Sequence, residues 1–205
     1  MTQASAKPVV AAFDFDGTLT RRDTLFPFLL HLAGYFKLFN KIIYLSPILA
    51  GYALSFIRND IAKVKVLRCF LANMEMNKVQ QFAQQFAEQE LPGLLRPEAM
   101  QRLAWHKQQG HRCVVVSASL EIYLRPWASK VGIDDVLGSR LEALDDGRTS
   151  GKLLGENCFG AEKMRRLEIL LGPREGYTLY AYGDSRGDKE LLSAADFAFF
   201  KKFGD

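Results

Sequence analysis

Residues 9–20 read VVAAFDFDGTLT, an apolar run followed by two acids and a Gly-Thr turn. The apolar run predicts a buried strand. Side chains of a strand alternate between its faces, so Asp14 and Asp16 are expected to leave this strand on the same side. Two close carboxylates repel each other unless a cation lies beside them, and Mg²⁺ prefers such hard oxygen ligands. Gly17 allows a sharp turn, and Thr18 offers a hydroxyl and an amide to an anion.

Three later stretches carry the partners that such a site needs, whereas an isolated D-x-D-G-T is also common in surface turns. Residues 113–119 (CVVVSAS) predict a second buried strand that ends in hydroxyls. Residues 159–163 (FGAEK) place a lysine at the head of a helix, and residues 177–188 (YTLYAYGDSRGD) predict a strand followed by two more acids. In a parallel α/β sheet the carboxyl ends of the strands meet at one edge, where ligands bind. We therefore expect these segments to converge there.

The converging groups can move a phosphoryl group through an enzyme-bound ester. A carboxylate can attack phosphorus, and a second acid can protonate the leaving oxygen and later activate water. Asp14 is the predicted nucleophile, and Asp16 is the predicted acid and base. The predicted phosphate-binding residues are Gly17, Thr18, Ser117, Ala118 and Lys163.

A divalent cation, Mg²⁺, is expected beside the nucleophile. The predicted metal ligands are the carboxylates of Asp14 and Asp184, together with a backbone carbonyl near Asp16. Asp188 is expected to support the site, either through a metal-bound water or by orienting Lys163. Alone, each residue has an ordinary explanation, such as a solvated lysine or an acid in the first turn of a helix. Together, and in this order along the chain, they favour a catalytic site.

These motifs resemble those of the haloacid dehalogenase (HAD) superfamily, in the phosphatase branch, subfamily IB, that includes phosphoserine phosphatase. The four motifs of that superfamily are matched by the acids of DFDGT, by Ser117, by Lys163 and by the acids of GDSRGD. The resemblance implies a Rossmann-like parallel-sheet core, Mg²⁺ dependence and an aspartyl-phosphate intermediate. Dehalogenases of the superfamily lack the second acid, so Asp16 favours phosphate chemistry. Receiver domains use a similar acidic cluster, but they are shorter and uncapped.

The chain is expected to fold as one α/β core with a small helical insertion. Residues 22–90 interrupt the alternation of strands and helices and are helical in pattern, which predicts a cap inserted after the first strand. Residues 1–21 and 91–205 would then form the catalytic core. Residues 141–153 predict a β-hairpin with Asp-Gly at its turn. A cap over the carboxyl edge of the sheet would exclude water and select the leaving group.

The first half of the predicted cap is strongly apolar. Residues 24–36 and 42–57 contain no acid, lysine or arginine, and Lys37 and Lys41 separate them. Each stretch is too short for a membrane-spanning helix and contains a proline. Two interpretations stay open: a hydrophobic helix pair buried on the core or in a dimer, or a pair that dips into a membrane interface. The second would bring the site to a phosphorylated lipid headgroup.

The cap resembles that of phosphatidylglycerophosphatase C more than that of phosphoserine phosphatase. The latter carries an acid at the start of its cap and an arginine further on, and Asp23 and Arg68 fall near those places as predicted substrate contacts. Residues 185–187 (SRG) and 118–119 (AS) depart from the Gly-Ala-Asn run and the paired glycines of those enzymes. We expect a lipid phosphate such as phosphatidylglycerophosphate as substrate. A small soluble ester, such as phosphoserine or a phosphorylated amino alcohol, is the alternative.

Composition narrows the class of protein further. The 205 residues, 48% of them apolar, suffice for one core and a modest insertion. The net charge of +4 fits an anionic substrate or lipid surface, and no basic run with interleaved aromatic residues indicates nucleic acid. The 3 cysteines are scattered, which argues against disulfides and zinc. Residues 1–7 are polar and lead into the catalytic strand, which predicts a cytoplasmic protein, at the cytoplasmic face of the inner membrane if the cap binds lipid.

Overall fold

A five-stranded parallel sheet forms the core of the computed structural model, which describes residues 7–54 and 56–203. The strand order is β3-β2-β1-β6-β7. The strands are β1 (Val9–Phe13), β2 (Arg112–Leu120), β3 (Asp135–Ser139), β6 (Thr178–Gly183) and β7 (Phe197–Phe200). The first strand of the chain is therefore the middle strand of the sheet, paired with β2 on one side and β6 on the other.

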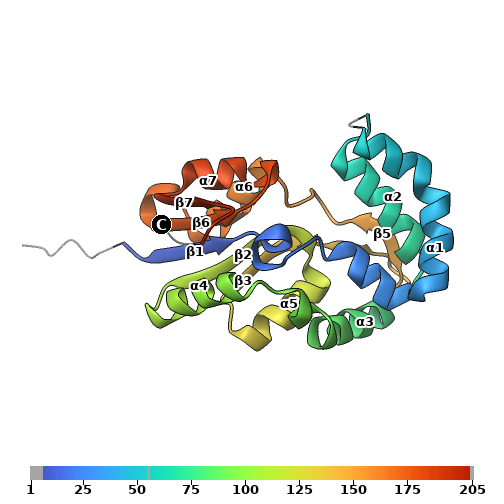
Figure 1. Cartoon of the computed structure of the whole chain (residues 1–205), viewed down its shortest axis with the longest axis horizontal. Coiled ribbons are helices and arrows are strands. Elements are labelled where there is room, and N and C mark those ends of the chain that lie inside the picture. Colours follow the sequence, from blue (N-terminus) through green and yellow to red (C-terminus); the bar gives the residue numbers. More distant parts are fainter. Residues whose placement is uncertain (1–6, 55, 204–205) are drawn as a thin grey trace, which may run out of the picture.

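Helices cover both faces of this sheet (Figure 1). On one face lie α4 (Pro97–Gln108) and α5 (Glu121–Val131), and on the other lie α6 (Ala161–Leu171) and α7 (Lys189–Ala194). The alternation of β1 explains this arrangement. Ala11 and Phe13 belong to the hydrophobic core under α4 and α5, and Val10 and Ala12 to the one under α6 and α7. A strand that is apolar on both faces is typical of a parallel sheet, and the predicted α/β fold is confirmed.

The predicted helical insertion lies between β1 and α4. It consists of α1 (Leu25–Ala53), α2 (Asn59–Leu71) and α3 (Met76–Gln89), which lie beyond one end of the sheet in Figure 1. The two apolar stretches that Lys37 and Lys41 separate in the sequence are not two helices divided at those lysines. The chain is helical across both lysines, and the helix is interrupted instead at Gly34, whose φ is 74°. Glycine adopts this angle without the steric cost that a Cβ brings.

The predicted hairpin forms β4 (Leu141–Ala143) and β5 (Thr149–Leu153), joined in an antiparallel pair. It packs against the cap: a Cβ on Gly151 would lie 2.6 Å from the Cα of Arg68 in α2. An isolated β-bridge joins Glu75 to Arg148. The hairpin therefore extends the cap in space. The boundaries 22–90 for the cap and 1–21 with 91–205 for the core stay a prediction, and residues 1–6, 55 and 204–205 lie outside the described part.

Large apolar side chains of α1 face solvent. Tyr35, Phe36 and Tyr44 are 82%, 79% and 76% exposed, although Phe28 and Leu29 at the start of the helix are buried. Burial of the whole apolar region on the core is therefore wrong, and contact with a second copy or with a membrane surface stays a prediction. Within the described residues, no helix combines the length and the hydrophobicity needed to cross a membrane.

Candidate active site

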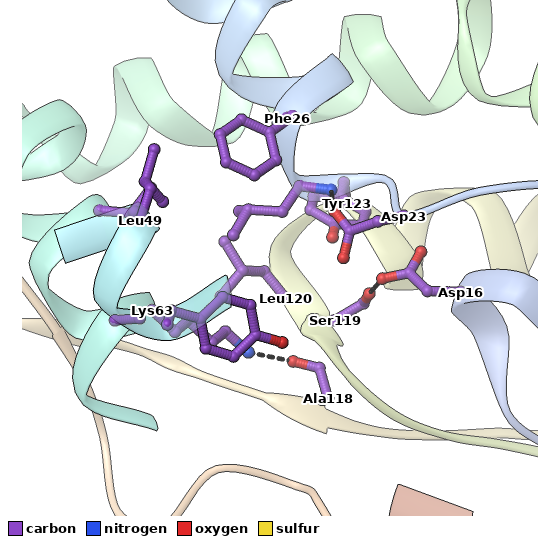
Figure 2. A pocket seen from close by; sticks show the side chains of 13 residues that line it. Asp16, Asp23, Phe26, Leu49, Lys63, Ala118, Ser119, Leu120 and Tyr123 are labelled. Carbon is purple, nitrogen blue, oxygen red and sulfur yellow. Dashed lines mark hydrogen bonds between the residues drawn. The ribbon is translucent and has the colours of Figure 1, made fainter. Parts of the chain in front are cut away.

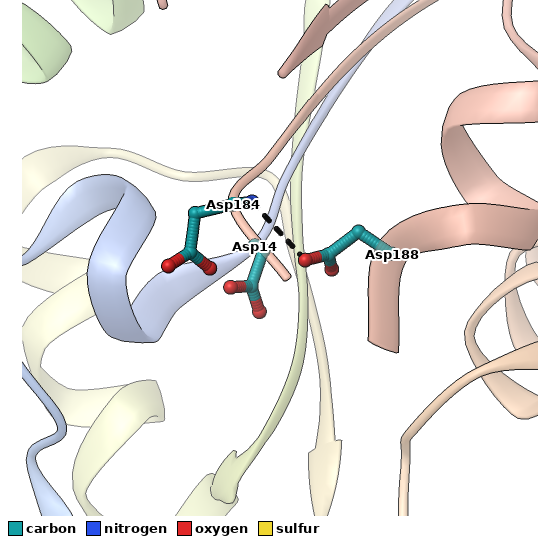
Figure 3. A group of neighbouring side chains, drawn as sticks. All are labelled: Asp14, Asp184 and Asp188. Atoms are coloured by element: carbon teal, nitrogen blue, oxygen red, sulfur yellow. Dashed lines mark hydrogen bonds between the residues drawn. The ribbon is translucent and has the colours of Figure 1, made fainter. Parts of the chain in front are cut away.

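The carboxyl ends of β1 and β6 bring acids together that are distant in sequence. Asp14 follows β1, and Asp184 and Asp188 follow β6. Each of these acids has a carboxylate oxygen within 4.8 Å of those of the other two. Figure 3 shows the three side chains as neighbours. Lys163, in the first turn of α6, donates to Asp14 at 2.6 Å and to Asp188 at 2.5 Å. The structure thus unites the first, third and fourth predicted motifs.

Burial dominates the electrostatics of this acidic cluster. Asp14, Lys163 and Asp188 are all buried. Burial raises the pKa of Asp14 to about 6, although the Lys163 ammonium opposes the rise. Burial by itself would lower the pKa of Lys163, but the charges of Asp14 and Asp188 outweigh it and raise that pKa. Burial and the charge of Asp188 also raise the pKa of the half-buried Asp184. The cluster thus contains the three carboxylates of Asp14, Asp184 and Asp188 and the ammonium of Lys163.

This donor set fits a divalent cation. Lys163 pairs with Asp14 and Asp188, and Asp184 adds a third carboxylate, so a cation would remove the excess negative charge. Oxygen ligands suit Mg²⁺. Asp188 is engaged elsewhere, because its Oδ2 accepts from the backbone N–H of Ser185 at 3.0 Å and its Oδ1 accepts from Lys163. This favours a supporting role for Asp188 and leaves Asp14 and Asp184 as the better ligands.

Gly17 lets the carboxylate of Asp184 approach the turn after β1 closely. Its φ is +78°, and a Cβ there would lie 2.2 Å from Oδ2 of Asp184. Only glycine satisfies both the turn and the close approach of the carboxylate.

The Asp16 side chain does not join the acidic cluster. Its Oδ1 accepts from the N–H and the hydroxyl of Thr24 at 3.0 and 2.7 Å, and its Oδ2 accepts from the Ser119 hydroxyl. The expectation that Asp14 and Asp16 point to the same side relied on strand alternation. β1 ends at Phe13, so this alternation does not extend to the acids. A metal role for Asp16 therefore concerns its backbone carbonyl alone, as predicted for that ligand.

The surroundings of Asp16 suit a group that exchanges protons. Burial raises the pKa of Asp16 to about 7, the charge of Asp23 adds to the rise, and the hydrogen bonds from Ser119 and Thr24 oppose it. A carboxyl with a pKa near neutrality can act both as an acid and as a base.

The predicted phosphate-binding residues come from three segments: the turn after β1, the end of β2 and the first turn of α6, where Lys163 contacts Asp14. Gly17 and Thr18 lie in the turn after β1, and the Thr18 hydroxyl donates to Oδ2 of Asp14 at 3.4 Å. Ser117 and Ala118 lie near the end of β2, and Ser117 is buried. The Ser117 Oγ accepts from the N–H of Ser119 at 3.1 Å, which leaves its own proton for another acceptor. Their role in binding phosphate stays a prediction.

A cavity of about 170 Å³ lies between the core and the cap, beside Asp16 (Figure 2). Asp16, Asp23, Lys63 and Ser119 form its polar lining. The apolar lining includes Leu25, Phe26, Leu49, Ala62, Val66 and Leu120. The space next to Asp16 is therefore amphipathic.

The two predicted cap contacts differ in position. Asp23 lines the cavity and Arg68 does not, so the structure favours Asp23, and both substrate contacts stay predictions. Arg68 is exposed on the part of α2 that packs against the hairpin. The basic residue at the cavity is Lys63, which the sequence analysis missed. Five positions along a helix turn a side chain by about 140°, so only one of the two can face the cavity. Nothing in the sequence pattern separates Lys63 from the other cap cations.

Comparison with known proteins identifies the family. The model of the haloacid dehalogenase-like hydrolases matches residues 11–193. The chain belongs to the haloacid dehalogenase-like hydrolase family. The resemblance to the haloacid dehalogenase superfamily that the motifs predicted is confirmed, and the chain is an enzyme of this hydrolase family. The likeness of its cap to that of phosphatidylglycerophosphatase C stays a prediction.

Two curated relatives illustrate the range of the family. Protein CicA of Caulobacter vibrioides is 38% identical over 190 residues, covering 93% of this chain and 84% of the relative. A histidinol-phosphatase of Neisseria meningitidis serogroup C is 28% identical over 128 residues, covering 60% of this chain and 57% of the relative.

Solved structures share the fold. A protein of unknown function from Bordetella pertussis Tohama I superposes with a TM-score of 0.77 at 22% identity, covering 92% of this chain and 87% of that chain. A phosphoserine phosphatase in a form analogous to its phospho-aspartyl intermediate superposes with a TM-score of 0.60 at 20% identity, covering 92% and 84%. At 22% and 20% sequence identity, these similarities show a shared fold.

Proposed function

We propose that this HAD enzyme is a Mg²⁺-dependent phosphomonoester hydrolase that forms an aspartyl phosphate on Asp14. The observation that carries the proposal is the buried contact of Lys163 with Asp14 and Asp188, beside Asp184. A carboxylate next to a fixed ammonium and an incomplete cation site is suited to attack a phosphate dianion. The structural likeness to a phosphoserine phosphatase in its phospho-aspartyl form supports the same intermediate.

In the first half-reaction, a carboxylate oxygen of Asp14 attacks phosphorus, and the bond from phosphorus to the ester oxygen breaks. Protonated Asp16 donates its proton to the leaving oxygen, so the product is a neutral alcohol. The pKa of Asp16, raised to about 7 by burial, leaves a large protonated fraction at neutral pH. The phosphoryl oxygens would be bound by Lys163, Ser117, Ala118 and the turn at Gly17 and Thr18.

In the second half-reaction, water attacks the phosphorus of the aspartyl phosphate. The Asp16 carboxylate takes a proton from this water, and the bond between phosphorus and the Asp14 oxygen breaks. Inorganic phosphate leaves, Asp14 is again a carboxylate, and Asp16 again carries its proton. Each group thus returns to its starting state.

Mg²⁺ would be held by Asp14, Asp184 and the backbone carbonyl of Asp16, with Asp188 in support. When bound, the cation supplies the positive charge that the three carboxylates and the phosphate dianion together require. Lys163 alone offsets the charge of one carboxylate.

We further propose a phosphorylated lipid headgroup, such as that of phosphatidylglycerophosphate, as substrate. The cavity beside Asp16 continues to Phe26 and Tyr52, which are 38% and 45% exposed and adjoin the exposed apolar face of α1. That helix carries Lys37 and Lys41 and no acid, a composition that suits an anionic membrane surface. Peripheral association of α1 with the membrane would bring the lipid to the cavity.

A small soluble ester is the second candidate, because the cavity lining also contains the charged side chains of Asp23 and Lys63. An amino alcohol or amino acid could pair with these charges. The relative named histidinol-phosphatase is in keeping with such a substrate.

Phosphate release from a panel of esters tests both parts of the proposal. The panel contains p-nitrophenyl phosphate, phosphoserine, and phosphatidylglycerophosphate in detergent micelles, each with Mg²⁺ or with EDTA. We expect Mg²⁺-dependent release, with kcat/KM at least about tenfold higher for the acylated ester because the apolar lining is then filled. Equal kcat/KM on the soluble esters would replace the lipid by the second candidate. No release from any ester in Mg²⁺ would overturn the proposed function.

A further inference from the structure

A lysine of the cap reaches into the core at the cavity. The Nζ of Lys63 donates to the Ala118 carbonyl and, at 2.8 Å, to Oδ1 of Asn157, and it lies 3.5 Å from the Ser139 Oγ. Figure 2 shows the ammonium directed at the Ala118 carbonyl. All these acceptors are neutral, and among residues 7–54 and 56–203 no carboxylate lies within ion-pair distance of Lys63.

The third of these contacts is weak. The Ser139 hydroxyl already donates to Oδ1 of Asn157 at 2.9 Å and accepts from the N–H of Cys158 at 3.2 Å. At 3.5 Å, Lys63 is at the limit of a hydrogen bond to the same oxygen. One N–H of the ammonium is thus available for a stronger acceptor. Burial lowers the pKa of Lys63 to about 8, although the charges of Asp16 and Asp23, which line the same cavity, oppose the decrease. A largely buried ammonium without a carboxylate in direct contact is costly.

Lys63 lies where its available N–H could reach a bound substrate. Lys63 and Asp16 line the same cavity, and Asp16 is the proposed proton donor to the leaving oxygen. The alcohol part of the substrate therefore extends along Lys63. Beyond it, Leu49 and Val66 offer an apolar wall.

On the basis of the proposed function, we propose that Lys63 binds an anionic group of the leaving alcohol, so that the enzyme prefers phosphomonoesters that carry a second negative charge. A carboxylate or a phosphodiester would replace the weak contact with Ser139 by a charge-assisted hydrogen bond. The remaining part of the alcohol would lie against Leu49 and Val66. Lys63 is then a specificity-determining residue that joins substrate to cap.

Ester pairs that differ in one anionic group test this inference. The first pair is glycerol 3-phosphate and 3-phosphoglycerate, and the second is glycerol 3-phosphate and its glycerophosphoglycerol phosphate analogue. An acylated form of the last ester distinguishes a lipid source from a soluble one. For the wild type we expect kcat/KM to be at least about tenfold higher on the anionic member. Lys63→Gln should reduce this ratio at least about tenfold, and Lys63→Arg should retain most of it.

Two control variants separate charge recognition from a purely structural contact. Lys65→Gln changes an exposed lysine of the same helix and should alter neither kcat/KM nor the ratio. Asn157→Ala removes the core acceptor but leaves the ammonium, so it should preserve the ratio. An equal loss on both members in Lys63→Gln, or a loss of the ratio in Asn157→Ala, would overturn the inference. So would a wild type without preference. Absence of hydrolysis of every ester in the presence of Mg²⁺, p-nitrophenyl phosphate included, would instead indicate that the proposed function fails, and the inference with it.

Discussion

At the scale of single residues, Lys163 partly balances the negative charge of the acidic cluster. Replacing different members of the cluster should therefore have unequal effects on activity and on the free energy of unfolding. Asp14→Asn takes away one buried negative charge and leaves Lys163 paired with Asp188 at 2.5 Å. We expect this variant to keep its unfolding free energy within about 2 kcal/mol of the wild type. Its phosphatase activity should fall at least about a thousandfold, because an amide cannot form the acyl phosphate. Rates of phosphate release and urea denaturation measure the two effects, and residual activity near the wild-type level would remove Asp14 from the mechanism.

Lys163→Ala is expected to be far more damaging to the fold. It leaves Asp14 and Asp188 buried without their cation, which should lower the unfolding free energy by about 3–5 kcal/mol in the absence of Mg²⁺. Adding Asp14→Asn to this variant should recover part of the loss, because one of the unpaired charges is then gone. Urea denaturation of the single and double variants at pH 7 gives the coupling energy. Strict additivity of the two substitutions would contradict the charge balance.

The residue scale is also where sequence reasoning succeeded and failed most clearly. The convergence of Asp14, Lys163 and Asp184 was predictable, because parallel topology forces strand ends to one edge. The partners of Asp16 were not, because they depend on how the turn after β1 and the first cap residue, Thr24, are oriented. Lys63 could not be chosen among the cap cations either, since its significance lies in contacts with three distant core segments.

At the scale of elements, α1 presents an apolar face that the rest of the chain does not cover. Replacing Phe36, Phe39 and Tyr44 together by serine should reduce binding to anionic liposomes at least about tenfold, because aromatic side chains at a membrane interface supply much of the attraction. Flotation of the protein with the liposomes measures the bound fraction.

Ile169→Ser is the matched control, because this exposed side chain, at 70%, belongs to α6 on the core. It should leave flotation unchanged. A wild type that stays with the unbound protein would remove the membrane proposal, and a molar mass that falls from dimer to monomer in the triple variant would favour contact between two copies.

The strands predicted in residues 9–20, 113–119 and 177–188 agree with β1, β2 and β6, and the helix predicted to begin near Lys163 agrees with α6, because apolar runs are local signals. The break at Gly34 and the packing of the hairpin on α2 are tertiary effects. Glycine is compatible with both a continuous and an interrupted helix, and the sequence of the hairpin carries no information on its partner.

At the scale of the whole molecule, a buried histidine couples stability to pH. His106 on α4 contacts the Tyr182 hydroxyl at 2.8 Å and His111 at 2.8 Å. Burial, together with the charge of Arg102, lowers the pKa of His106 to about 3 from an ordinary value of 6.5. Between these values the unfolded chain binds a proton that the folded chain does not, so the contribution of His106 to stability is present above pH 6.5 and is lost as the pH falls toward 3.

The quantity to measure is the difference in unfolding free energy between the wild type and His106→Gln. Burial raises the pKa of Asp14 and Asp16, and these acids act on stability in the opposite direction over the same range, but they do so equally in both proteins. The wild type should therefore lose about 3 kcal/mol of unfolding free energy relative to the variant between pH 7 and pH 4. Guanidinium titrations at several pH values measure it. Parallel stability curves would show that His106 is not a buried neutral group.

The central position of β1 in the sheet has a consequence for folding during synthesis on the ribosome. The strand made first needs neighbours on both edges, and β6, on one of them, is synthesised more than a hundred and fifty residues later. A nascent chain that stops before Thr178 therefore has an unpaired edge in the middle of its future sheet, and it lacks Asp184 and Asp188. The acidic cluster is therefore complete only after the segment from Thr178 onward has docked beside β1.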